Sequence, residues 1–293
     1  MKEISKISIV VSFLALWITS KLESGDQTMI GFFFIFSFGI LHGANDLVLI
    51  KNLKDKKNRS YLTFLSMYVS IVLISALLFT TIPLTALMIF IVISAYHFGE
   101  QHFQDLEEYR WRFGKPLFYF VYGSFILLVL FYFHSVEVQK VILNITGYDL
   151  DVVTNPVPLI LSGIALSLLM VYNYFNLPNF KKRIASEILY LFIFALIFKL
   201  GSLIWGFAIY FILWHSIPSL HDQIKFLYGK YSFNNFKLYF KSAFVYWIVS
   251  LIGIGVVYYF LKDKTVFDAI FFSFIAAITF PHAFVILKMF EKK

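Results

Sequence analysis

Four histidines lie inside long apolar stretches of the sequence, where an imidazole is costly to bury. They occur in the segments HGAND at 42–46, YHFGEQHF at 96–103, WHSIPS at 214–219 and FPHAFVIL at 280–287. Ionisable groups in membrane-spanning helices usually face the interior of the bundle and mark function. Neutral imidazole binds iron, zinc, copper and nickel well. The pattern therefore predicts a metal site formed by His42, His97, His215 and His282.

Carboxylates follow two of these histidines at helical spacing. Asp46 comes four residues after His42, and Glu100 comes three residues after His97. Residues at these spacings share one helix face, where a carboxylate can orient the imidazole of a metal ligand. We therefore expect Asp46 to orient His42, and Glu100 to orient His97. Asp222 follows His215 by seven residues, but Pro218 is expected to end that helix first.

The composition predicts an all-α polytopic membrane helix bundle. The 293 residues are 60% apolar and only 14% charged, whereas soluble domains carry roughly 25% charged residues. We expect residues 1–293 to form a single integral-membrane catalytic domain. There is no cysteine, which excludes disulfides, iron–sulfur clusters and thiol nucleophiles. The net charge of +8 comes from short loops between apolar runs, which favours an orientation signal over nucleic-acid binding.

About ten transmembrane helices are predicted, because each needs about 20 mostly apolar residues, or about 17 when short. We expect the stretch 186–216 to be two short helices divided at 199–201. The predicted helices are 4–20, 29–50, 61–81, 83–99, 117–134, 157–177, 186–199, 202–216, 241–261 and 266–290.

The basic residues predict that both termini are cytoplasmic. With the N-terminus inside, 20 of the 25 Lys and Arg residues fall on the cytoplasmic side, including the run KNLKDKKNR at 51–59. Cytoplasmic loops of membrane proteins carry such an excess. Residues 1–20 lack a small-residue cleavage site, so we interpret them as a first membrane helix. The predicted location is the inner cell membrane.

This layout places the four histidines in one layer. Each lies on a helix that runs from outside to inside, and at 1.5 Å per residue each is roughly 20–24 Å below the outer surface. His134 ends the fifth helix and is expected at the interface. His102 and His221 lie past their helix ends, as solvated residues or as spare ligands.

The four segments resemble, in order and spacing, the motifs of the Brp/Blh family of bacterial and archaeal carotene-cleaving membrane proteins. HGAND is similar to its HGxxD element, YHFGEQHF to its HFG element, WHSIPS to its HS element and FPHAFVIL to its PH element. The resemblance spans nearly the whole chain. It implies a beta-carotene 15,15'-dioxygenase that cleaves the central double bond of beta-carotene to two retinal molecules, with Fe(II) as cofactor and O2 as co-substrate.

Carried over by motif, the resemblance implies that His42, His97 and His215 are iron ligands. The family often has a second histidine four residues after the one in its HS element, and this sequence has Ser219 there. The fourth ligand is therefore open. The predicted depth of His282 in the membrane, which matches that of the other three histidines, favours it as the fourth ligand. His221 and His102 are the alternatives.

The resemblance also implies the partners: beta-carotene, the lipid bilayer and, as acceptor of retinal, a microbial rhodopsin. We expect the carotenoid to enter laterally from lipid and to lie between aromatic residues that flank the histidines. The candidate wall residues are Phe38, Tyr96, Phe98, Phe211, Trp214 and Phe284.

Three other functions use some of the same features. A transporter or proton relay also buries His, Asp and Glu, but transporters often show internal repeats, and none is evident here. A membrane desaturase or hydroxylase would need clustered histidine boxes, which this sequence lacks. A structural membrane protein would have no reason to align four histidines. Metal content and product analysis distinguish these functions.

Overall fold

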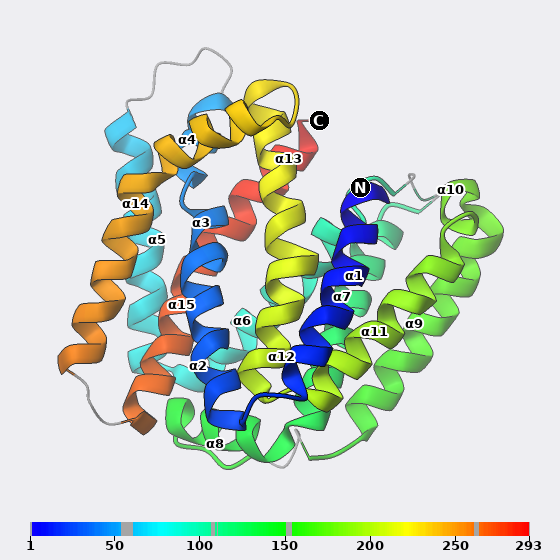
Figure 1. Ribbon diagram of the computed structural model, residues 1–293, viewed down its shortest axis with the longest axis horizontal. Helices are drawn as coiled ribbons and strands as arrows, with labels where there is room; N and C mark the ends of the chain where they lie inside the picture. The colour runs from blue at the N-terminus through cyan, green and yellow to red at the C-terminus, as the bar shows by residue number, and fades with distance from the viewer. Residues whose placement is uncertain are drawn as a thin grey trace. The chain divides into compact units, whose positions relative to one another are not determined.

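The computed structural model describes residues 2–53, 61–106, 109, 111–150, 154–260 and 264–292, and no strand occurs among them (Figure 1). Two short segments are π-helical, η1 and η3. The elements are α1 (Lys2–Thr19), α2 (Ser24–Phe34), η1 (Ile35–Gly39), α3 (Ile40–Gly43), α4 (Asp46–Leu53), α5 (Tyr61–Thr81), α6 (Pro83–His102), α7 (Gly114–Phe133), α8 (Ser135–Thr146), α9 (Val157–Asn176), α10 (Pro178–Lys181), α11 (Ile184–Leu200), α12 (Leu203–Tyr210), η3 (Phe211–Ser216), α13 (Ile217–Tyr228), α14 (Phe233–Phe260) and α15 (Lys264–Glu291).

The all-helical prediction is confirmed for the described residues. The predicted division of 186–216 is also found, because α11 ends at Leu200 and α12 begins at Leu203. Gly201 is extended at this break, and the Ser202 backbone N–H donates to Gln27 Oε1 at 2.8 Å. Helix α8 was not predicted, because its 12 residues are too short and too polar for a membrane span.

Seven helical stretches in the described part of the chain are long and apolar enough to cross a membrane, as in a multi-pass membrane protein. Two shorter apolar helices, Ile4–Thr19 and Leu65–Thr81, accompany them. The count of ten and the cytoplasmic termini stay predictions. Of the basic run at 51–59, residues 54–59 lie outside the described residues.

The chain divides into two compact units. The first comprises Met1–Ile35, Ser94–Gln139 and Leu150–Pro218. Within it α2 packs against α12, α7 packs against α9, and α11 contacts α1, α7 and α12. The second comprises Phe36–Ile93, Lys140–Asp149 and Ser219–Lys293. Within it α15 packs against α4, α5 and α14, and α14 also contacts α3.

In the first unit, α6 and α7 approach each other closely at two glycines. A Cβ atom at Gly99 would lie 1.9 Å from the carbonyl oxygen of Tyr119, and one at Gly123 would lie 1.8 Å from that of Ala95. Small residues allow the backbones of membrane helices to approach in this way. Because Gly99 is two residues from His97, this contact fixes where that histidine stands against α7.

We expect Gly123→Ala to destabilise the protein, because either the Ala95 carbonyl or the whole helix must move. Overpacking of this kind costs about 1–3 kcal/mol. Thermal unfolding of the detergent-solubilised protein would measure it. Gly253→Ala is the matched control, since a Cβ there meets nothing within 4 Å. Equal melting temperatures for the two variants would contradict the close approach.

Candidate metal centre

His42 ends a helix. The segment that begins at α2 stays helical through α3, leaves the helix at Ala44 and Asn45, and resumes as α4 at Asp46. The carbonyl oxygen of His42 accepts a hydrogen bond from Gln223 Nε2 at 2.9 Å. The Tyr239 hydroxyl lies 3.2 Å from the same oxygen and 2.8 Å from Gln223 Oε1. Side chains of α13 and α14 thus satisfy a polar group at this helix end.

The turn after His42 is held by Asn45, which is fully buried. Its Nδ2 donates to the Tyr239 carbonyl at 2.9 Å, and its Oδ1 accepts from the Ser242 hydroxyl at 2.9 Å. No role of Asn45 is predicted from the sequence. An amide side chain inside an apolar run was the signal that could have indicated one, because a buried amide needs partners.

Asp46 does not take the predicted place beside His42. Its Oδ1 lies 2.9 Å from His282 Nδ1, and its Oδ2 accepts a hydrogen bond from the Tyr68 hydroxyl at 3.0 Å. The prediction assumed a continuous helix, and the turn at Ala44 and Asn45 breaks the four-residue spacing. An ionised carboxylate can only accept, so His282 Nδ1 donates and Nε2 keeps the lone pair that a metal would need.

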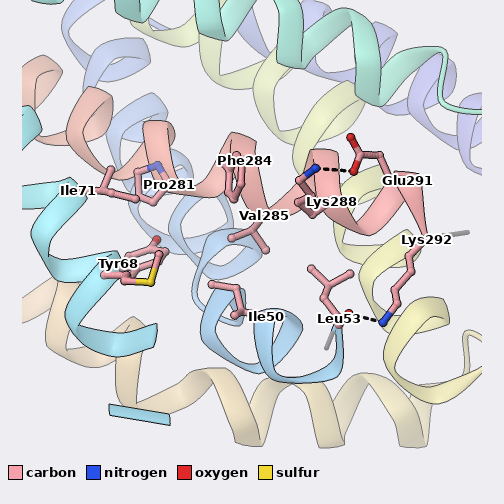
Figure 2. Close-up of a pocket in the computed structure, with 11 residues that line it drawn as sticks. Ile50, Leu53, Tyr68, Ile71, Pro281, Phe284, Val285, Lys288, Glu291 and Lys292 are labelled. Atoms are coloured by element: carbon pink, nitrogen blue, oxygen red, sulfur yellow. Dashed lines mark hydrogen bonds and ion pairs between the residues drawn. The ribbon is translucent and has the colours of Figure 1, made fainter. Parts of the chain in front are cut away.

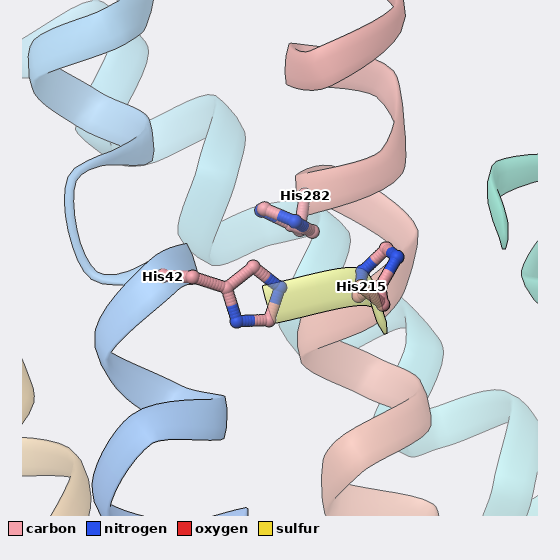
Figure 3. Close-up of side chains that lie close together, drawn as sticks. All are labelled: His42, His215 and His282. Carbon is pink, nitrogen blue, oxygen red and sulfur yellow. The ribbon is translucent and has the colours of Figure 1, made fainter. Parts of the chain in front are cut away.

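His42 and His282 form a close pair within the second unit. Their ring centroids are 4.8 Å apart and their planes are at 89°. Both residues are buried, with 4% of each exposed. Figure 3 shows the two rings turned toward each other from α3 and α15.

His97 and His215 form a corresponding pair within the first unit. Their ring centroids are also 4.8 Å apart, at an interplanar angle of 79°, and both residues are buried. Glu100 Oε2 lies 3.8 Å from His97 Nδ1. The two groups lie near each other because α6 is continuous through both residues. The orienting role of Glu100 stays a prediction.

Two of the predicted wall residues contact His215. The Phe98 ring centroid is 4.8 Å from that of His215, and Phe211 stacks on it at 5.4 Å with an angle of 16°. Trp214 instead donates from its indole Nε1 to the Ser12 hydroxyl at 3.0 Å. Aromatic rings therefore cover the imidazole of His215 within its own unit.

Pro218 does not end the helix, contrary to expectation. The chain is π-helical over Phe211–Ser216 and continues as α13 to Tyr228. In a π-helix each N–H reaches the carbonyl five residues back, which for position 218 is that of Leu213. Proline has no N–H to donate, and the Ser8 hydroxyl donates to the Leu213 carbonyl instead, at 2.8 Å. Because the Ser8 hydroxyl replaces the missing backbone N–H, the helix continues through Pro218.

The alternative ligands have other contacts. His102 Nε2 lies 2.7 Å from Glu187 Oε2 and 3.2 Å from the Tyr122 hydroxyl. His221 Nδ1 lies 3.7 Å from Asp222 Oδ1. Ser219, at the position where the Brp/Blh family often has a second histidine, accepts from Gln223 Nε2 at 3.1 Å. Its hydroxyl thus supports the amide that holds the His42 carbonyl.

The donor set suits a transition metal. His42 and His282 in the second unit and His215 in the first are each buried histidines with ring nitrogens that could serve as metal ligands. Imidazole nitrogens of this kind suit iron as well as zinc and copper. The hydrogen bond from His282 to Asp46 is the kind of support that fixes the ring and tautomer of a metal-ligating histidine.

Comparison with models of protein families matches residues 33–290 to the family described as beta-carotene 15,15'-dioxygenase. The match covers all four histidine segments. Comparison with curated proteins and with solved structures gave no match.

We expect Asp46→Asn to weaken metal binding about 10- to 100-fold, because the replacement loses the charge that orients His282. Titration of the metal-stripped protein with Co(II), followed by its visible absorption, would measure the affinity. Glu137→Gln is the control, since Glu137 Oε2 lies 3.3 Å from His134 Nδ1 and so forms a His–carboxylate pair that includes none of the four histidines. Equal Co(II) affinity in both variants would argue against an orienting role for Asp46.

Proposed function

Since the chain belongs to the beta-carotene 15,15'-dioxygenase family, we propose that it cleaves the central double bond of beta-carotene with O2 and releases two molecules of all-trans-retinal. The observation that carries the proposal is the arrangement of the family motifs. Their four histidines are buried and form two close pairs, His42 with His282 and His97 with His215.

We propose that these four histidines hold one non-haem Fe(II). The four histidines would supply neutral imidazole donors, which would leave the charge of the iron uncompensated. When bound, the iron supplies the redox chemistry that activates O2 toward the alkene. His282 is preferred as the fourth ligand because it pairs with His42 and because its hydrogen bond with Asp46 fixes its ring and tautomer.

The protein's own residues position and shield this centre. Asp46 and Glu100 orient His282 and His97. Phe98 and Phe211 cover His215 with apolar surface, which excludes water and strengthens the electrostatic interactions inside. The carotenoid contributes no polar group, so its position must be set by apolar burial, at about 25 cal/mol per Å².

We further propose that the whole chain acts as one catalytic domain in the inner cell membrane. Beta-carotene would then enter from the lipid, and retinal would return to it, where a rhodopsin could accept it. A transporter or proton relay would share the buried ionisable residues but would need no iron. Metal analysis of the purified protein therefore separates the two functions.

Expression in a beta-carotene-producing bacterial strain tests the activity. Wild-type cells should lose their colour and accumulate retinal, as measured by chromatography, and the purified protein should contain iron. His42→Ala should stop both colour loss and retinal formation while the protein stays in the membrane, because one ligand and one half of a histidine pair are lost.

His134→Gln is the matched control. His134 Nε2 donates to the Phe198 carbonyl at 2.7 Å, outside both histidine pairs, and glutamine retains a donor. This variant should bleach the cells like wild type. If wild-type protein is present in the membrane and the cells keep their beta-carotene, the proposed function is wrong.

A further inference from the structure

An apolar groove lies along one face of α15 in the second unit. It has a volume of about 400 Å³ and is lined by residues of α4, α5 and α15 (Figure 2). The α15 residues recur at helical spacing, from Pro281 through Val285 to Lys288, and Lys292 follows directly after the helix. The volume is within the range of small-molecule sites, about 300–1,000 Å³.

The groove begins beside the proposed metal centre. Pro281 precedes His282, and Tyr68 lines the same end, where its hydroxyl is engaged by Asp46. The aromatic ring of Tyr68 therefore lines the groove, while its hydroxyl is hydrogen-bonded to Asp46. Figure 2 shows Tyr68, Ile71 and Pro281 together at this end.

The charged residues of the groove are at its other end. Lys288 Nζ lies 2.6 Å from Glu291 Oε2, and Lys292 donates to the Leu53 carbonyl. Between the two ends the lining is aliphatic and aromatic, and one of the lining residues, Phe284, is 58% exposed. An apolar chain could therefore enter sideways from lipid.

The length of the groove corresponds to half of a carotenoid. The ten residue steps from Pro281 to Glu291 rise roughly 15 Å along α15. A carotenoid is about as long as the hydrocarbon core of a bilayer is thick, about 30 Å, so half of it extends about 15 Å from its central bond.

We propose that this groove binds one half of the carotenoid, with the central double bond at the Pro281 end and the ring near Leu53 and Lys288. The proposal rests on the proposed function and adds a substrate site to it. The length of the groove between His282 and the charged end then determines which double bond of the carotenoid lies at the metal, and this length selects the central bond.

Two tryptophan substitutions at different distances from His282 test this selection by length. Ile71→Trp fills the near end and should lower kcat/KM about 10- to 100-fold for every carotenoid. Leu53→Trp fills the far end and should cause the same loss for beta-carotene. It should have little effect on an apocarotenal that is shortened at one end and still contains the central bond, because the shortened half does not reach position 53.

Ile252→Trp is the control. Ile252 lies on α14, is 60% exposed and does not line the groove, so its variant should behave like wild type. Co(II) titration should give equal metal affinity for all three variants, which shows that they are folded around the metal centre.

The outcomes separate this proposal from the proposed function. An active wild type whose Leu53→Trp variant cleaves both substrates equally well overturns the groove alone. Native mass spectrometry gives a second test of the groove. If a phospholipid co-purifies with wild type, and Leu53→Trp loses this phospholipid but keeps full activity, the groove is a lipid site and the groove proposal is wrong. A wild type inactive on both carotenoids overturns both proposals.

Discussion

The hydrogen bond between Asp46 and His282 is the interaction on which the arrangement of the second unit depends. Asp46 is 1% exposed, and a buried carboxylate is costly unless it is paired and hydrogen-bonded. Its two oxygens engage His282 of α15 and Tyr68 of α5. One side chain at the start of α4 thus connects three helices, and loss of either partner would leave an unsatisfied group in an apolar surrounding.

The helices that carry His42 and His215 are both irregular, and each irregularity is compensated by a distant side chain. The end of α3 is satisfied by Gln223, and the carbonyl that Pro218 cannot reach is satisfied by Ser8. Membrane interiors offer no water to backbone groups, so such breaks persist only where protein supplies the partner. We infer that these polar contacts hold two histidines in positions that regular helices would not give them.

The sequence predicted the helices better than the contacts between them. Hydropathy over about 20 residues locates a membrane helix, and so the break at Gly201 and the pair His97–Glu100 were predicted. The partner of Asp46 was not, because it is 236 residues away and because the segment HGAND contains no proline to indicate a helix end. Tyr68, Gln223 and Tyr239 were missed for the same reason, since their roles arise from tertiary contacts that spacing along one helix cannot reveal.

Ser219 shows how a departure from a motif can be accommodated. The family often has a histidine at this position, whereas the serine here is fully buried and accepts a hydrogen bond from the Gln223 amide. That amide holds the carbonyl of His42, whose ring pairs with His282. A larger imidazole at position 219 would need room that the present packing gives to Gln223. The position therefore supports a histidine pair through the backbone of one member. His282 stays the proposed fourth ligand, because Asp46 already hydrogen-bonds its ring.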